Sequence, residues 1–182
     1  TLTLAFSADP FVRFCYPDPV SYLAHFPSFA EAFGGKAFTC GSAYHSADYL
    51  GSALWLPPDT RAEEKDVFED IERTLDPLIT KTVFAVLNQL GINHPEEPHW
   101  YLAVLGTDPA YQGAGVGSAL IRSVLDRCDA QGLGASVAER LAEVIERHGQ
   151  GQELTEGVPP EVVLLLELLD VLRRRTAGAG LE

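Results

Sequence analysis

Several residue types and sequence features are scarce in this chain of 182 residues. It has no methionine, and its three cysteines, Cys15, Cys40 and Cys128, are far apart and form no C-x-x-C pair. That number and spacing indicate free thiols in a reducing compartment rather than a disulfide framework or a zinc site. No apolar run approaches the roughly 20 residues that a membrane-spanning helix requires, and the first residues lack the basic segment of a signal peptide. We therefore expect a cytoplasmic protein that binds neither a membrane nor a metal ion.

Positive charge is also scarce, because 13 Lys and Arg residues stand against 26 Asp and Glu residues, for a net charge of −13. A nucleic-acid-binding surface needs clustered Lys and Arg to neutralise phosphates, so this charge argues against a nucleic-acid partner. The remaining composition, 46% apolar and 21% charged, is typical of a globular protein with a full hydrophobic core.

Aromatic residues are absent from the last part of the chain. All 17 lie at or before Tyr111, and the 71 residues that follow contain none. This change of composition predicts two parts, a core over residues 1–134 and a helical C-terminal segment over residues 135–182. Three interpretations of the second part stay open: it packs on the core, it mediates association into a homodimer or with another partner, or it is an engineered or frameshifted replacement.

The first part alternates helical and strand patterns. The predicted elements, in chain order, are a helix over 21–35, a hairpin of strands over 36–48 and 49–58, helices over 60–91 divided at Pro77, a strand over 99–107 and a helix over 118–132. The strand HWYLAVLGT is the clearest of these, because it is rich in aromatic and branched residues and has no breaker before Gly106.

The stretch TDPAYQGAGVGSAL, from Thr107 to Leu120, joins that strand to the last helix. Asp108-Pro109 turns the chain, and the backbone N–H groups from Gln112 to Gly117 come at the start of the helix. Glycines let a ligand approach this backbone closely, and a helix N-terminus offers unpaired donors and partial positive charge. The loop is therefore predicted to bind an anion, with phosphate or diphosphate as the best match.

Three kinds of phosphate-binding loop compete for this pattern. A Walker A loop needs a lysine after its last glycine, and here Gly117 is followed directly by Ser118. A Rossmann loop needs G-x-G-x-x-G close behind the strand, whereas GAGVGS comes after the intervening residues DPAYQ. The third pattern, Q-x-x-G-x-G after a strand and a proline turn, is present with Gln112, Gly115 and Gly117. It resembles the acyl-CoA loop of the GCN5-related N-acetyltransferase (GNAT) family.

The resemblance covers roughly residues 1–134 and implies a GNAT-like α/β fold, with a mixed, largely antiparallel central sheet flanked by helices. It implies that acetyl-CoA binds with its pantetheine amides on the end of the strand and its diphosphate on the loop amides. The matching residues are Leu105, Gly106 and Thr107 in the strand, and Gln112, Gly113, Ala114, Gly115, Val116, Gly117 and Ser118 in the loop. The implied activity is transfer of acetyl from acetyl-CoA to a primary amine of a small molecule or peptide.

Direct acetyl transfer needs a base for the amine and an acid for the leaving thiolate. Glu97 and His99 lie just before the loop-bearing strand and are candidates for the base, the alternative being a solvated connector. Tyr101 is a candidate proton donor or a wall of the acceptor site, although a tyrosine in a strand is more often part of the core. Regular alternation would place Tyr101 on the same face of the strand as Leu105.

The resemblance stops after residue 134. The family implies a fifth strand, a helix that often carries a thiol-protonating tyrosine, and a closing hairpin. Instead, Ser136 and Glu139 form a capping box and an apolar stripe with helical spacing follows. We therefore expect a helical C-terminal segment in place of the last strands. Two other functions stay open, a CoA-binding protein without turnover and an interaction module that uses the Leu-rich C-terminal helix.

Overall fold

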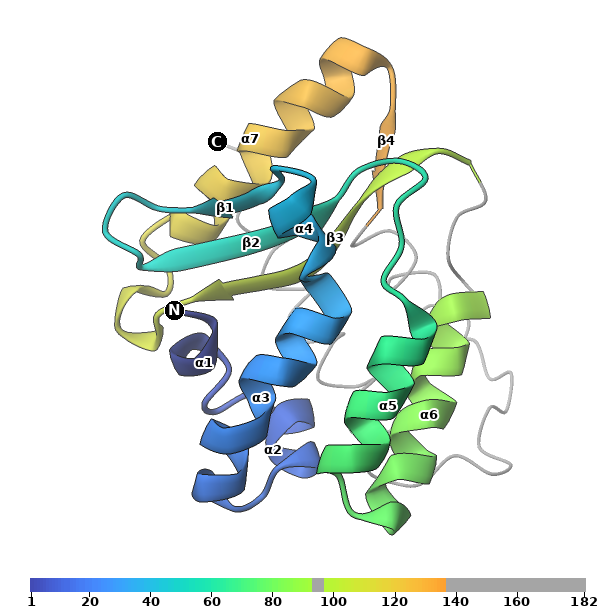
Figure 1. The fold of residues 1–182 in the computed structure, drawn as a ribbon. Helices are drawn as coiled ribbons and strands as arrows, with labels where there is room; N and C mark the ends of the chain where they lie inside the picture. The colour runs from blue at the N-terminus through green and yellow to red at the C-terminus, as the bar shows by residue number, and fades with distance from the viewer. Residues whose placement is uncertain (93–96, 137–182) are drawn as a thin grey trace, which may run out of the picture. The chain divides into compact units, whose positions relative to one another are not determined.

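A computed structural model describes residues 1–92 and 97–136. The chain divides into two compact units. The first, Thr1–Thr80 with Pro95–Ser136, contains the β-sheet and is the part of the molecule that concerns the functional site (Figure 1). The second, Lys81–His94 with Val137–Glu182, is described only over residues 81–92, so the predicted helical segment after Ser136 lies outside the described residues.

The described sheet has four strands in the order β1-β2-β3-β4. They are β1 (Ala43–His45), β2 (Gly51–Leu56), β3 (His99–Thr107) and β4 (Gly134–Ser136). The first three are antiparallel neighbours, whereas β4 runs parallel to β3. The expectation of a mixed, largely antiparallel sheet flanked by helices is thereby confirmed.

Helices precede, interrupt and follow the strands. They are α1 (Leu2–Ala5), α2 (Pro10–Cys15), α3 (Pro19–Gly34), α4 (Lys36–Thr39), α5 (Glu64–Thr74), α6 (Pro77–Ile92) and α7 (Val116–Gln131), with a 3-10 turn η1 (Pro109–Tyr111). Aspartate-proline pairs start α2 and α3, because the carboxylates of Asp9 and Asp18 accept first-turn amides at 2.9 and 2.8 Å and proline suits the first helical position. No described helix has both the length and the apolar character needed to cross a bilayer.

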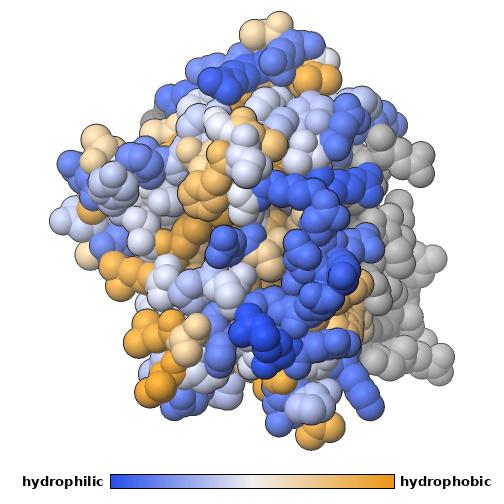
Figure 2. Space-filling model, viewed as in Figure 1, coloured by the Kyte–Doolittle hydropathy of each residue, from blue (hydrophilic) through white to orange (hydrophobic). Residues whose placement is uncertain are grey.

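The two faces of the sheet carry different helices. Helix α7 packs on one face, while α1, α3 and α4 contact the other (Figure 1). The α7 face buries Trp55 and Trp100 against Val124, and the opposite face buries Leu54, Leu56 and Val104. On the surface shown in Figure 2, hydrophilic side chains cover the region of α5, whose first turn is acidic, and apolar side chains gather at the lower left, on the side of the first helices.

Most predicted elements are confirmed, including the strand over residues 99–107 and the division of the long helical stretch at Pro77. The strand expected over residues 36–48 is wrong in its first half, which forms α4. Helix α3 ends at Gly34, and its C-cap residue Gly35 has helical angles, φ −64° and ψ −23°, so α4 can begin directly after it. Part of the predicted hairpin remains, as β1 and β2.

The absence of a strand after α7 was also predicted, and this prediction is wrong for residues 134–136. Gly134–Ser136 forms β4 and pairs with the start of β3. Ser136 therefore ends a strand at the position where the capping box would have it begin a helix. The edge of β3 offers unpaired backbone groups, and pairing with them outweighs the local capping signal.

Candidate functional site: the glycine loop and the open edge of strand β3

The loop after β3 is built by a short series of local hydrogen bonds. Asp108 caps η1, because its carboxylate accepts the Ala110 amide at 2.9 Å and its carbonyl accepts the Tyr111 amide at 2.8 Å. The Tyr111 carbonyl then accepts the Ala114 amide at 3.2 Å, which turns the chain toward α7. These contacts leave the next backbone groups at the surface, at the start of the helix.

Two glycines in this loop adopt a backbone conformation that other residues rarely take. Gly113 has φ +79°, and Gly115, the N-cap of α7, has φ +81° and ψ 0°. A Cβ built on either residue would meet no atom of the described residues within 4 Å. Glycine is thus required by the backbone angle and not by crowding within the protein, and the space beside both residues is open to a ligand.

The first turn of α7 presents amides that the described protein does not use. The first helical hydrogen bond joins the Ala119 amide to the Gly115 carbonyl at 2.9 Å. Among the described residues, no acceptor pairs with the amides of Val116, Gly117 and Ser118, and a glycine N-cap supplies no side-chain oxygen to them. A cluster of unpaired N–H groups at the positive end of a helix is suited to bind a phosphate group.

Gly51, the first residue of β2, fixes where α7 begins, and the sequence analysis missed it. A Cβ on Gly51 would lie only 2.6 Å from Val116 Cγ1 and 3.0 Å from Leu120 Cδ1. The helix therefore starts in direct contact with the glycine backbone of the strand beside β3. The sequence signal was a glycine that follows the hairpin turn, and the turn alone is enough to explain a glycine there.

The outer edge of β3 is open next to this loop. Strand β4 pairs with β3 only from His99 to Tyr101, and the described residues provide no partner strand for the rest of that edge (Figure 1). Asp108 N donates to Leu50 O at 2.7 Å, so Leu50 and Asp108 form a hydrogen-bonded pair that continues the antiparallel ladder of β2 and β3. Bonded and non-bonded pairs alternate in such a ladder.

This alternation shows which main-chain groups face the open edge. Thr107 is opposite Gly51 and Leu105 is opposite Ala53, which makes both of them non-bonded pairs. The N–H and C=O groups of Leu105 and Thr107 consequently point away from β2. Those of Gly106 point toward β2, and a Cβ on Gly106 would lie 2.7 Å from Ala5 Cβ in α1.

A bulge in β3 corrects the predicted orientation of Tyr101. The register shifts between Leu54 and Trp55, so that Ala103 is an extra residue in β3. Each extra residue reverses the alternation of side chains between the faces. Leu105 accordingly packs on the α7 face and Tyr101 on the opposite face. Burial raises the pKa of the Tyr101 phenol.

The candidate catalytic residues lie at the other end of β3 from the loop. Glu97 is exposed and precedes the strand, and His99 is half-buried at its first position. The Nδ1 atom of His99 is 2.7 Å from the Glu97 carbonyl oxygen. Glu97, His99 and Tyr101 thus lie close together in the chain where β3 begins, and Tyr101 is about 20 Å along the strand from Thr107.

The described residues contain no group of three His, Cys, Asp or Glu side chains arranged to hold a metal ion. Cys15 and Cys128 are buried and Cys40 is exposed, and all three are free thiols.

Comparison with known proteins shows which family has this sequence pattern. The sequence model of the acetyltransferase (GNAT) family matches residues 21–149, more than half of the chain. A solved structure described as histone acetyltransferase HPA2 and related acetyltransferase, from Corynebacterium glutamicum, shows 24% sequence identity and a TM-score of 0.44. That match covers 70% of this chain and 62% of the other, so this chain spans less than two thirds of that protein. By the family match, the chain belongs to the acetyltransferase (GNAT) family.

Proposed function

We propose that this protein transfers an acetyl group from acetyl-CoA to a primary amine of a small molecule or peptide. The observation that carries the proposal is a set of amides at the start of α7, on Val116, Gly117 and Ser118, that have no acceptor within the described part of the chain. They lie beside Gly113 and Gly115, where the same part of the chain leaves open space. These donors suit the diphosphate of the coenzyme. They also explain how a protein with a net charge of −13 could hold a polyanion without a basic patch.

The open edge of β3 supplies the second part of the proposed site. Leu105 and Thr107 direct N–H and C=O groups away from β2, next to the loop. The amides of a pantetheine arm can pair with such groups as an added strand does. An arm bound in this way would run along the edge from the loop toward the end of β3 that carries Tyr101.

Acetyl transfer then needs little covalent help from the protein. The amine nitrogen attacks the thioester carbonyl carbon, a C–N bond forms, and the C–S bond breaks to release a thiolate that must be protonated. We assign the base to His99, which lies at the first position of β3 with its Nδ1 atom 2.7 Å from the Glu97 carbonyl oxygen. We assign the acid to Tyr101, because a phenol is protonated at neutral pH and burial raises its pKa further.

Substitution of Gly115 by valine tests the proposal. The new side chain would enter the open space beside the loop amides, and we expect the affinity for acetyl-CoA to fall on the order of a hundredfold, because two charge-assisted hydrogen bonds contribute about 3 kcal/mol. Gly41→Val is the matched control, since Gly41 also has a positive φ of +65° and open space around its Cβ position but lies outside the loop.

Isothermal titration with acetyl-CoA measures binding, and a free-thiol release assay over small amines and peptides measures turnover and the acceptor class. We expect wild type and Gly41→Val to release thiol at the same acetyl-CoA concentrations, and Gly115→Val to need on the order of a hundredfold more acetyl-CoA. Equal affinity of all three proteins for acetyl-CoA would contradict the assignment of the loop. Binding without thiol release from any acceptor would leave a CoA-binding protein without turnover.

A further inference from the structure

The hairpin between β1 and β2 exposes a pair of stacked aromatic rings. The rings of His45 and Tyr49 lie 4.4 Å apart between centroids and 12° from parallel. Both residues are exposed, with Tyr49 at 64% of its full accessibility. An exposed stack contributes little to a hydrophobic core, so its role in the fold does not account for it.

The backbone of Tyr49 adopts an unfavourable conformation to present its ring. Its φ is +55°, in the left-handed region that bulky side chains rarely enter. Two contacts within the hairpin hold this angle: Tyr49 N donates to Ser46 O at 2.9 Å, and Ser46 Oγ accepts the Leu50 amide at 2.9 Å. A third comes from the N-terminus, where Thr1 Oγ1 donates to Tyr49 O at 2.7 Å. Strain that is held by such contacts at an exposed residue is characteristic of binding sites.

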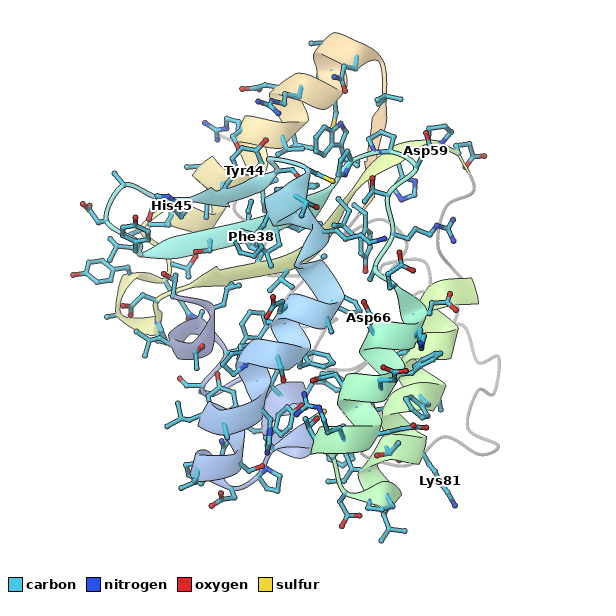
Figure 3. All side chains as sticks on the ribbon, viewed as in Figure 1. Phe38, Tyr44, His45, Asp59, Asp66 and Lys81 are labelled. Atoms are coloured by element: carbon cyan, nitrogen blue, oxygen red, sulfur yellow. The ribbon has the colours of Figure 1, made fainter. Side chains whose placement is uncertain are left out.

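The stack lies beside the glycine loop. Leu50, the residue after Tyr49, accepts the Asp108 amide at the start of the loop. Gly51 follows and touches Val116 in the first turn of α7. Two residues of chain span at most about 7 Å, so Tyr49 is within about the length of one nucleoside from the helix start. In Figure 3, His45 is at the end of the sheet where β3 runs into the loop.

We propose that His45 and Tyr49 form a stacking platform for the adenine ring of acetyl-CoA. This inference rests on the proposed function, because the diphosphate on the α7 amides sets where the nucleoside can reach. Every base has a π face, and aromatic side chains bind it by stacking. From Ala43 to Gly51 the hairpin contains no Lys or Arg, so its own residues offer the 3′-phosphate no cation.

Tyr49→Gly is the decisive variant, because glycine accepts the positive φ freely while the ring is lost. We expect this variant to be at least as stable as wild type in thermal unfolding. Its affinity for acetyl-CoA should fall about tenfold, and its affinity for 3′-dephospho-acetyl-CoA should fall by the same factor. Affinity for S-acetyl-4′-phosphopantetheine, which lacks the adenosine, should not change. Tyr49→Phe keeps the ring and should bind all three thioesters as wild type does.

Titration calorimetry with the three thioesters separates the outcomes. Unchanged affinity of Tyr49→Gly for acetyl-CoA would overturn the platform and leave the proposed function standing. An equal loss for S-acetyl-4′-phosphopantetheine would also overturn it, because the substitution would then act on the loop. If wild type binds none of the thioesters, the proposed function fails and the platform fails with it.

Discussion

Replacing Gly51 by alanine tests how closely the start of α7 approaches the sheet. The new Cβ would lie 2.6 Å from Val116 Cγ1, and ordinary contact begins at 3.4 Å, so one group must move by about 0.8 Å. Gly51 is not among the glycines with positive φ, so the substitution tests crowding and not backbone strain. Overpacking of this kind costs about 1–3 kcal/mol.

The cost should appear in both stability and binding. A loss of about 2 kcal/mol lowers the Tm of a chain of this size by about 4–8 °C. Because Val116 begins the helix whose amides form the proposed diphosphate site, displacement of this turn should also weaken acetyl-CoA binding about tenfold. Thermal unfolding and titration calorimetry measure the two effects on the same protein samples.

Two further variants serve as a control and as a compensating substitution. Gly134→Ala is the matched control, since a Cβ there meets no atom of residues 1–92 and 97–136 within 4 Å and its φ is not positive. It should leave Tm within about 2 °C of wild type. Val116→Ala removes the methyl group that the new Cβ meets, so in the Gly51→Ala background it should recover part of the lost stability. A Gly51→Ala protein with wild-type Tm and affinity would show that the contact is not as close as described.

Two other predictions concern the open edge and alkaline pH. In hydrogen exchange, the Leu105 and Thr107 amides should exchange fast in the free protein and slow at least tenfold with acetyl-CoA; protection already complete in the free protein would contradict the open edge. Burial raises the pKa of Cys15 from 9.0 to about 12 and that of Tyr16 from 10.0 to about 12, so the unfolded chain loses these protons first. The free energy of unfolding should therefore fall as pH rises from about 9 toward 12. Denaturant titrations from pH 8 to 11 measure it, and a value that rises with pH would contradict the burial of both groups.

Local signals were sufficient for the elements that interact mainly with themselves. The strand over residues 99–107 carries an uninterrupted run of β-forming residues. Helix α7 shows its buried side in the spacing of Leu120, Val124 and Cys128. The position of the glycine loop could also be predicted, because Gly113 and Gly115 adopt angles that only glycine takes easily.

Features that depend on pairing between distant segments could not be predicted from the sequence. The extra residue at Ala103 exists only in register with β2, so regular alternation put Tyr101 on the wrong face. Strand β4 exists because β3 offers it an edge, and a local capping pattern at Ser136 hid it. The close approach of Gly51 to Val116 joins two distant segments, so it cannot be predicted from either segment alone.

The central claim is that the amides at the start of α7 hold the diphosphate of acetyl-CoA. Amide chemical shifts of a 15N-labelled protein, recorded during titration with acetyl-CoA, test it most directly. We predict large downfield proton shifts for Val116, Gly117 and Ser118, and small shifts for amides already bonded in the loop, such as Ala114. Saturable binding of acetyl-CoA that leaves these three amides unshifted would contradict the claim.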